Sequence, residues 1–125
     1  MQIKSLDHLV LTVKDINKAV EFYVNVLGME KEIFKANRVA LKFGQQKINL
    51  HELGNEFEPK AKNVHVGSAD LCFITDTVLD VVIEHMNSFN IKIEEGPLLR
   101  TGAMGVINSV YIRDPDQNLI EISNY

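Results

Sequence analysis

The first half of the chain opens with alternating apolar and polar residues and continues with helical spacing. The alternation over residues 6–13 predicts a strand with one aliphatic face. Apolar residues then recur at helical spacing between Asp15, a residue type that caps helices, and Gly28, a residue type that ends them. Three further short strands are expected over residues 30–34, 38–43 and 47–53.

The second half repeats this pattern after a polar connector over residues 54–67, which contains Pro59. A strand is expected over residues 70–75, and Thr77 with Asp80 predicts a capping box that starts a second helix. The helix is expected to bury Val78, Val81, Val82, Met86 and Phe89. Further strands are expected over residues 91–94, 107–113 and 119–123. The chain is therefore predicted to be a diverged tandem repeat of β-α-β-β-β.

Equivalent positions of the two halves carry residues that can bind metal ions. Superimposing the last strands of the halves places Asn49 opposite Glu121, and superimposing the first strands places His8 opposite Asp70. His51 follows two residues after Asn49 on the same strand face. All five lie on the faces away from the predicted helices, so they are candidates for lining one concave surface.

The segment Asp114–Glu121 places a carboxylate where a metal ligand is expected. Asp-Pro-Asp-Gln-Asn is turn chemistry, and the alternation after it points Glu121 away from the aliphatic face. More ordinary interpretations stay open at this stage. His8 is also compatible with a hydrogen-bonded interior histidine, and Asp70 with a backbone cap or a group that orients His8.

Composition narrows the class of protein. The hydrophobic share of 46% and charged share of 24% are typical of a soluble globular protein, and a net charge of −4 gives no reason to expect nucleic-acid or anionic-membrane binding. The single cysteine, Cys72, and the lack of an apolar run of about 20 residues favour a cytoplasmic protein.

Three segments make the chain resemble the vicinal oxygen chelate superfamily, which includes glyoxalase I, extradiol dioxygenases and fosfomycin- and bleomycin-resistance proteins. They are D-H-L-V-L-T-V, A-V-E-F-Y-V-N-V-L-G-M-E and D-P-D-Q-N-L-I-E-I-S. Within the superfamily, K-I-N-L-H-E, E-F-E-P-K-A and E-E-G-P-L-L-R-T-G-A are similar to small glyoxalase-domain-containing proteins.

The resemblance implies an α+β fold, in which two tandem β-α-β-β-β modules form a cupped mixed sheet with helices on its outer face. It implies a single domain over residues 1–125, with module one over about 1–53, the connector over about 54–67 and module two over about 68–125. It further implies a homodimer.

The resemblance also implies a site that binds one divalent metal ion, with Zn, Ni, Fe, Mn and Mg as candidates. His8 and Glu121 match the family's first-strand and last-strand ligands. Asn49 and Asp70 depart from the usual ligand types at their positions, and His51 is a candidate to replace one of them. Glu121 is also the expected proton shuttle.

Residues 96–105, with three glycines and a proline, predict a loop shaped for closure over a ligand. Arg100 in this loop is suited to bind a carboxylate or phosphate, although a solvated surface arginine is an equal alternative. The substrate is therefore expected to be small and anionic. Further candidates for its binding are Phe34, Arg38, Phe57, Met104 and Tyr111.

The resemblance implies a metal-dependent lyase or isomerase acting on a 2-oxoaldehyde or a 2-oxoacid derivative. Two alternatives remain, an extradiol-type dioxygenase and a metal-free binding or resistance protein. The dioxygenase needs two histidines and a carboxylate at the metal, which Asp70 disfavours unless His51 joins the site.

Overall fold

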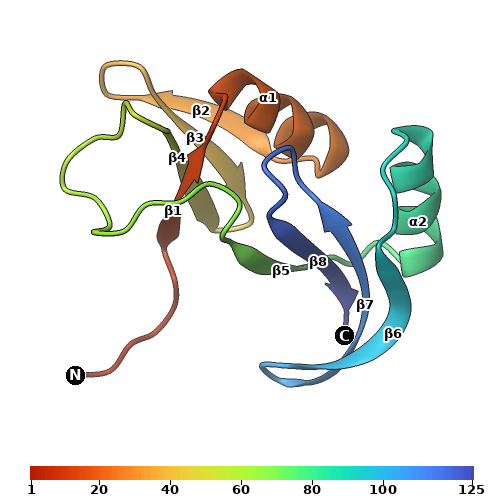
Figure 1. Cartoon of the computed structure of the whole chain (residues 1–125). Helices are drawn as coiled ribbons and strands as arrows, with labels where there is room; N and C mark the ends of the chain where they lie inside the picture. The colour runs from red at the N-terminus through yellow and green to blue at the C-terminus, as the bar shows by residue number, and fades with distance from the viewer. The chain divides into compact units, whose positions relative to one another are not determined.

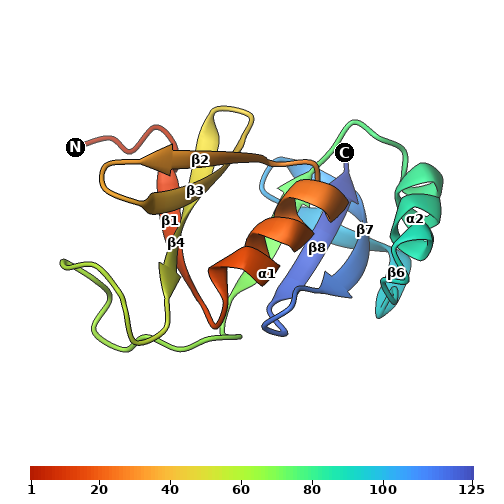
Figure 2. The same ribbon diagram turned by 90° about the horizontal axis from the view of Figure 1, so that it is seen from above.

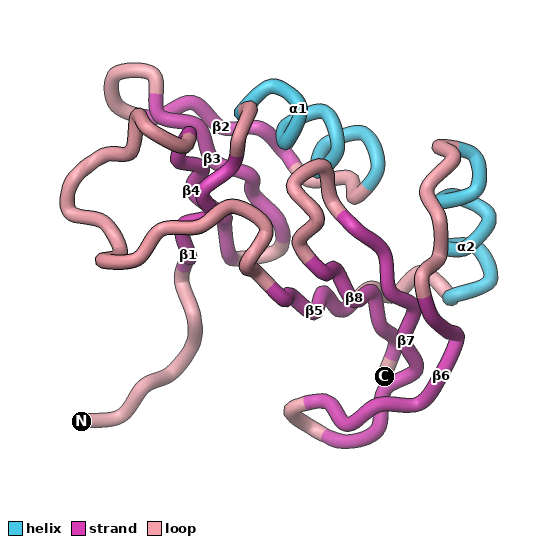
Figure 3. Tube along the Cα trace, in the orientation of Figure 1, coloured by secondary structure: helices cyan, strands magenta, loops and turns pink.

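The computed structural model describes residues 1–125, and the chain divides into two compact units, unit 1 (Met1–Val66) and unit 2 (Gly67–Tyr125). The elements of unit 1 are β1 (His8–Val13), α1 (Ile16–Glu21), η1 (Phe22–Val26), β2 (Glu30–Phe34), β3 (Arg38–Phe43) and β4 (Gln46–Glu52). Those of unit 2 are β5 (Asp70–Ile74), α2 (Leu79–Ser88), β6 (Glu95–Gly102), β7 (Gly105–Arg113) and β8 (Leu119–Asn124). Figure 3 colours them by type.

Unit 1 contains a four-stranded mixed sheet in the order β1-β4-β3-β2 (Figure 1). β1 and β4 run parallel, whereas β3 runs antiparallel to both β4 and β2. α1 contacts β4, and the apolar face of the sheet is buried at Val13, Leu41, Ile48 and Leu50. The other face of the sheet carries His8, Asn49 and His51.

Unit 2 repeats this topology with the order β5-β8-β7-β6 (Figure 2). β5 and β8 run parallel, and β7 runs antiparallel to its two neighbours. α2 contacts β7, while Val110, Ile112, Ile120 and Ile122 are buried. The α+β fold and the tandem β-α-β-β-β repeat are thus confirmed, whereas the arrangement as a single domain stays a prediction.

The first helix begins and ends where the sequence predicts. Asp15 is its N-cap, and its Oδ1 accepts a hydrogen bond from the Lys18 backbone N–H at 3.1 Å. The helix continues as the π-helical turn η1 and ends before Gly28, whose φ of 72° is in the left-handed region.

The second helix starts differently from the prediction. Its N-cap is Val78, which has no side chain able to bond the helix, so the Thr77–Asp80 capping box is wrong. The Leu79 N–H instead donates to Oδ1 of Asn124 at 3.1 Å. Because β8 supplies this acceptor from a distant part of the chain, the local sequence could not reveal the cap.

The buried residues of α2 agree with the prediction in part. Leu79, Val82 and Met86 are buried, which confirms two of the expected positions. Val78, Val81 and Phe89, however, are exposed. Val81 lies off the face that the buried residues define, whereas Val78 and Phe89 are the cap residues at the two ends of the helix.

Residues 96–102 belong to strand β6, which corrects both the strand expected over 91–94 and most of the loop expected over 96–105. β6 pairs with β7 as a hairpin that places Leu98 opposite Ser109 and Arg100 opposite Ile107. Two of the glycines lie at irregular points of this hairpin. Gly96 lies at a register shift in the pairing of β6 with β7, and Gly105 follows the turn between the two strands. Arg100 is therefore fixed on a strand.

Candidate functional site

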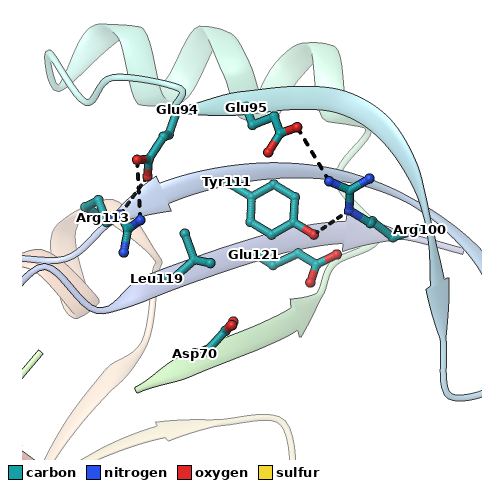
Figure 4. Close-up of a pocket in the computed structure, with 8 residues that line it drawn as sticks. All are labelled: Asp70, Glu94, Glu95, Arg100, Tyr111, Arg113, Leu119 and Glu121. Carbon is teal, nitrogen blue, oxygen red and sulfur yellow. Dashed lines mark hydrogen bonds and ion pairs between the residues drawn. The ribbon is translucent and has the colours of Figure 1, made fainter. Parts of the chain in front are cut away.

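A pocket of about 370 Å³ lies on the sheet of unit 2 (Figure 4). Eight residues line it, and seven of them stand on β5 to β8. They are Asp70, Glu94, Glu95, Arg100, Tyr111, Arg113, Leu119 and Glu121.

Strand register brings the central pocket residues to one face. Tyr111 of β7 stands opposite Glu121 of β8, and Arg113 stands opposite Leu119. Leu119 also stands opposite Asp70 of β5, so Asp70 is one row away from Glu121 on the same face. The sheet itself therefore positions these side chains.

The turn before β8 is held by a buried carboxylate. Oδ1 of Asp114 accepts hydrogen bonds from the backbone N–H groups of Asp116 and Asn118, both at 2.9 Å. Its Oδ2 accepts from Nδ2 of Asn118 at 2.8 Å, and Oδ1 of Asn118 accepts from the Ala69 N–H. These bonds hold the start of β8 beside β5, the two strands that carry Glu121 and Asp70.

Two ion pairs neutralise half of the acidic residues in the pocket. Arg113 donates to both carboxylate oxygens of Glu94, at 2.6 and 3.3 Å. Nη2 of Arg100 lies 3.6 Å from Oε1 of Glu95. The remaining acidic side chains of the lining, Asp70 and Glu121, are in no ion pair, so four carboxylates minus two guanidinium groups leave two negative charges.

Glu121 is oriented by serine hydroxyls. Oγ of Ser109 donates to Oε1 of Glu121 at 2.6 Å, and Oγ of Ser123 lies 3.4 Å from the same oxygen. The two hydroxyls are also hydrogen-bonded to each other at 2.8 Å, and both serines are buried. One carboxylate oxygen is thus held by the protein, while the carboxylate lines the pocket.

Tyr111 is a neutral hydrogen-bond donor in this pocket. Burial, opposed by the hydrogen bond from Arg100, raises the pKa of its phenol above the ordinary value. Nε of Arg100 donates to the phenol oxygen at 3.0 Å, and a hydrogen bond to Glu121 further raises the pKa of the phenol, so its proton faces that carboxylate. Nη1 of Arg100 donates to the Leu99 carbonyl at 3.4 Å and Nη2 is paired with Glu95, so part of the guanidinium N–H groups is left for a ligand.

In unit 1, His8 and Asn49 have free acceptor atoms. Nδ1 of His8 lies 2.7 Å from Oδ1 of Asp7; the carboxylate accepts the Nδ1 proton, which leaves the lone pair of Nε2 open. Histidines that bind metal commonly have this carboxylate partner. Oδ1 of Asn49 is buried and has no hydrogen-bond partner.

His51 differs from His8 because its Nε2 already has a hydrogen-bond partner. Its Nε2 lies 3.4 Å from Nη2 of Arg38, and because a guanidinium only donates, Nε2 is the acceptor. Burial, and secondly the charge of Arg38, lowers the pKa of His51. The imidazole is therefore neutral at pH 7, with its proton on Nδ1.

The structure brings four of the sequence-predicted residues into one pocket, namely Asp70, Arg100, Tyr111 and Glu121. Phe34, Arg38 and Phe57 form a separate group around His51 in unit 1. Met104 lies exposed in the turn between β6 and β7, outside the lining of the pocket.

Sequence reasoning missed Glu94, Glu95, Arg113 and Leu119. Two of them could have been predicted from strand alternation. Arg113 is two residues from Tyr111 and Leu119 is two residues from Glu121, so each shares a strand face with a predicted residue.

Divalent metal ions fit the donor types of the candidate residues, although the structure has no group of three or more His, Cys, Asp or Glu side chains that could hold a metal ion. The two unpaired carboxylates of unit 2 match the charge of such an ion, and the free nitrogen of His8 is a suitable ligand atom. His51 is less suited, because Arg38 occupies its Nε2.

The sequence model of the glyoxalase/bleomycin resistance protein/dioxygenase superfamily matches residues 5–122. The chain belongs to this superfamily. The match covers both units and every element, in agreement with the repeated topology. The resemblance to this superfamily that the sequence motifs indicated is therefore confirmed.

Close relatives within the superfamily share the full length of the chain. An integron cassette protein of Vibrio cholerae, VCH_CASS1, has 63% identity and a TM-score of 0.98, with 100% of this chain and 98% of that chain covered. Virulence protein STM3117 of Salmonella typhimurium is 58% identical over 100% of this chain and 87% of its own length. Glyoxalase domain-containing protein RDO1 of Mycosarcoma maydis is 50% identical over 100% of this chain and 70% of its own length.

Neither α1 nor α2 is long and apolar enough to cross a membrane.

Proposed function

We propose that this protein is a metal-dependent, glyoxalase-like lyase or isomerase that acts on a small anionic substrate with two neighbouring oxygen atoms. The observation that carries the proposal is the charge of the unit 2 pocket, where Asp70 and Glu121 have no basic partner although two arginines stand beside them. Superfamily membership and the similarity to a glyoxalase domain-containing protein support the same chemistry.

Asp70 and Glu121 are the unit 2 residues that hold the ion in this proposal. His8, Asn49 and His51, the other sequence-predicted ligands, belong to unit 1 and remain ligand candidates there. A bound divalent ion polarises the two substrate oxygens and stabilises negative charge that develops on them.

Glu121 is the proton acceptor in the proposed reaction. Ser109 holds one of its oxygens through the 2.6 Å hydrogen bond, which fixes the direction of the carboxylate without neutralising it. A carboxylate in this position can take a proton from the carbon next to the polarised carbonyl and return it to the neighbouring atom. The exchange of one proton between adjacent atoms is an isomerisation.

Arg100 and Tyr111 bind the substrate in the proposal. The Tyr111 O–H donates to a substrate oxygen, and Arg100, which already donates Nε to the phenol, offers its remaining N–H groups to an anionic group. The Glu94–Arg113 pair sits at the other end of the lining, where its two charges neutralise each other. With a divalent ion to balance the charges of Asp70 and Glu121, the pocket would suit an oxygen-rich, anionic molecule.

The test is metal analysis of purified full-length protein by plasma mass spectrometry after reconstitution with Zn, Ni, Fe, Mn or Mg. We expect about one ion per chain in the wild type and its loss in Glu121→Gln and Asp70→Asn, and His8→Ala tests separately the sequence-predicted ligand of unit 1. Glu94→Gln is the matched control, because Glu94 lines the same pocket but is paired with Arg113. It should keep the metal.

Turnover of 2-oxoaldehydes and 2-oxoacids by the loaded protein is the second readout. An unchanged metal content in Glu121→Gln, or a wild type that takes up none of the ions, contradicts the proposal. Ring cleavage of catechols without activity on dicarbonyls would reassign the protein to the dioxygenases. Ligand binding without any metal would reassign it to the binding proteins.

A further inference from the structure

One arginine of unit 1 is held in a fixed position on the polar face of the sheet. Phe34 stands opposite Arg38 in the β2–β3 pairing, and the neighbouring β3–β4 pair is Val39 opposite Leu50, which puts Arg38 beside His51. The guanidinium carbon lies 5.4 Å from the centre of the Phe34 ring and 4.5 Å from that of Phe57. Together with the bond to His51, these contacts restrain a side chain that is otherwise flexible.

Arg38 is the cation of this region that no carboxylate neutralises. Lys42 and Lys47, which share its sheet face, lie 3.3 and 4.0 Å from the carboxylate of Glu32. Lys60 lies 3.5 Å from Glu56 and 3.9 Å from Glu58. No carboxylate stands within ion-pair distance of Arg38, and its one hydrogen-bond partner there, His51, is neutral.

We propose that Arg38 binds the carboxylate of a small organic acid. The two aromatic rings contact the guanidinium and His51 accepts a hydrogen bond from Nη2, so the other N–H groups remain available along the edge of the guanidinium. Two parallel N–H groups on such an edge match the two oxygens of a carboxylate. The aromatic rings also remove water from around the cation, which strengthens an ion pair formed there. This inference concerns the polar face of unit 1 alone and goes beyond the proposed function, which rests on the pocket of unit 2.

The charge of the cluster selects a carboxylate over a phosphate group. Lys42 and Lys47 share the carboxylate of Glu32, whereas Lys60 lies near two carboxylates. These lysines and Arg38 therefore give four positive charges against three negative ones. The single positive charge that remains matches the single negative charge of a carboxylate. A phosphate close to pH 7 carries more than one negative charge, roughly 1.5 to 2, and needs a second cation for compensation. His51 does not supply it, since its neutral Nε2 is the acceptor for Arg38.

The experiment follows the Nε–H resonance of Arg38 by NMR in the full-length, metal-free protein. Glycolate, pyruvate and inorganic phosphate are titrated separately at pH 7 in the presence of a chelator. We expect a saturable shift with both carboxylates, and binding weakened about tenfold or more in Arg38→Lys, which keeps the charge but loses the planar fork. Lys42→Gln is the matched control, because it removes a paired cation from the same face, and it should bind like wild type.

Three results overturn the assignment. They are an Arg38 resonance that no carboxylate shifts, undiminished binding by Arg38→Lys, and tighter binding of phosphate than of either carboxylate. Amide spectra of each variant show whether it is folded. The titration uses metal-free protein, so its result does not depend on whether the proposed metal site exists. Failure of carboxylate binding would likewise not change the result of the metal analysis.

Discussion

Oγ of Ser109 donates a 2.6 Å hydrogen bond to Oε1 of Glu121 across the β7–β8 pair. Ser109 is completely buried, whereas Glu121 is partly exposed in the pocket, so the bond joins the core of unit 2 to its candidate site. A hydroxyl that is held by a strand can fix a carboxylate more firmly than water does, because the donor is already in place. The position of the carboxylate consequently depends on a residue that does not line the pocket.

Replacing Ser109 with alanine should weaken metal binding without removing any candidate ligand. Glu121 loses its short hydrogen bond and the orientation that comes with it, and partners of this kind typically change metal affinity by about 10-fold or more. The measurement is a competition titration against a chromophoric chelator. Ser123→Ala is the control, since Ser123 lies 3.4 Å from the same oxygen, and it should have a smaller effect on affinity. Equal affinity in Ser109→Ala and wild type would contradict the role of this bond.

Asp114→Asn should destabilise the protein by roughly 1–3 kcal/mol. Both carboxylate oxygens of Asp114 accept hydrogen bonds, from two backbone N–H groups on one side and from Nδ2 of Asn118 on the other. An asparagine has one accepting oxygen, so its NH₂ group must face donors on one side. Urea unfolding followed by circular dichroism measures the loss. Asp76→Asn, an exposed position, should leave the free energy of unfolding nearly unchanged.

The turn that begins at Asp114 shows which features of the fold the sequence alone could predict. Its Asp-Pro-Asp-Gln-Asn pattern and the alternation after it are local signals, and they placed Glu121 on the polar face of the last strand correctly. Strand β6 was missed because Gly96 and Pro97 are typical of loops, while the pairing with β7 that makes the segment a strand is a tertiary contact.

The sequence predicted half of the residues that line the pocket. Asp70 and Glu121 were found because the repeat and the alternation of the strands place them on one face, whereas Arg100 was named in a segment expected to be a loop. The Arg113–Glu94 ion pair was not predicted, since it joins positions 19 residues apart and no local pattern specifies which charges meet. The free Nε2 of His8 and the occupied Nε2 of His51 likewise depend on hydrogen bonds that only coordinates reveal.

His51 should make the stability of the protein fall as the pH drops below neutrality. Burial lowers the pKa of His51 in the folded chain below its ordinary value of 6.5, so the unfolded chain takes up a proton first. The stabilising contribution is therefore complete above pH 6.5 and is lost as the pH falls toward the folded pKa. The free energy of unfolding, measured across this range, should depend less on pH in His51→Gln than in wild type.

The charge of Arg38 offers a second check on this pH dependence. Arg38 is the second cause of the lowered pKa of His51, after burial. Arg38→Gln should therefore reduce the fall in stability on acidification without abolishing it. An equal slope in wild type and His51→Gln would show that other groups produce the effect.

Arg100→Gln should shift the titration of Tyr111 to higher pH. Burial already raises the pKa of the phenol, and the hydrogen bond and positive charge of Arg100 oppose that rise by stabilising the phenolate. Removing them leaves the burial and the negative charge of Glu121 unopposed. Ultraviolet difference titration measures the change, and Tyr111→Phe identifies its signal among the three tyrosines. Arg113→Gln is the control, because Arg113 lines the same pocket but is bonded to Glu94. An identical shift in both arginine variants would mean that general charge, and not the 3.0 Å hydrogen bond, governs Tyr111.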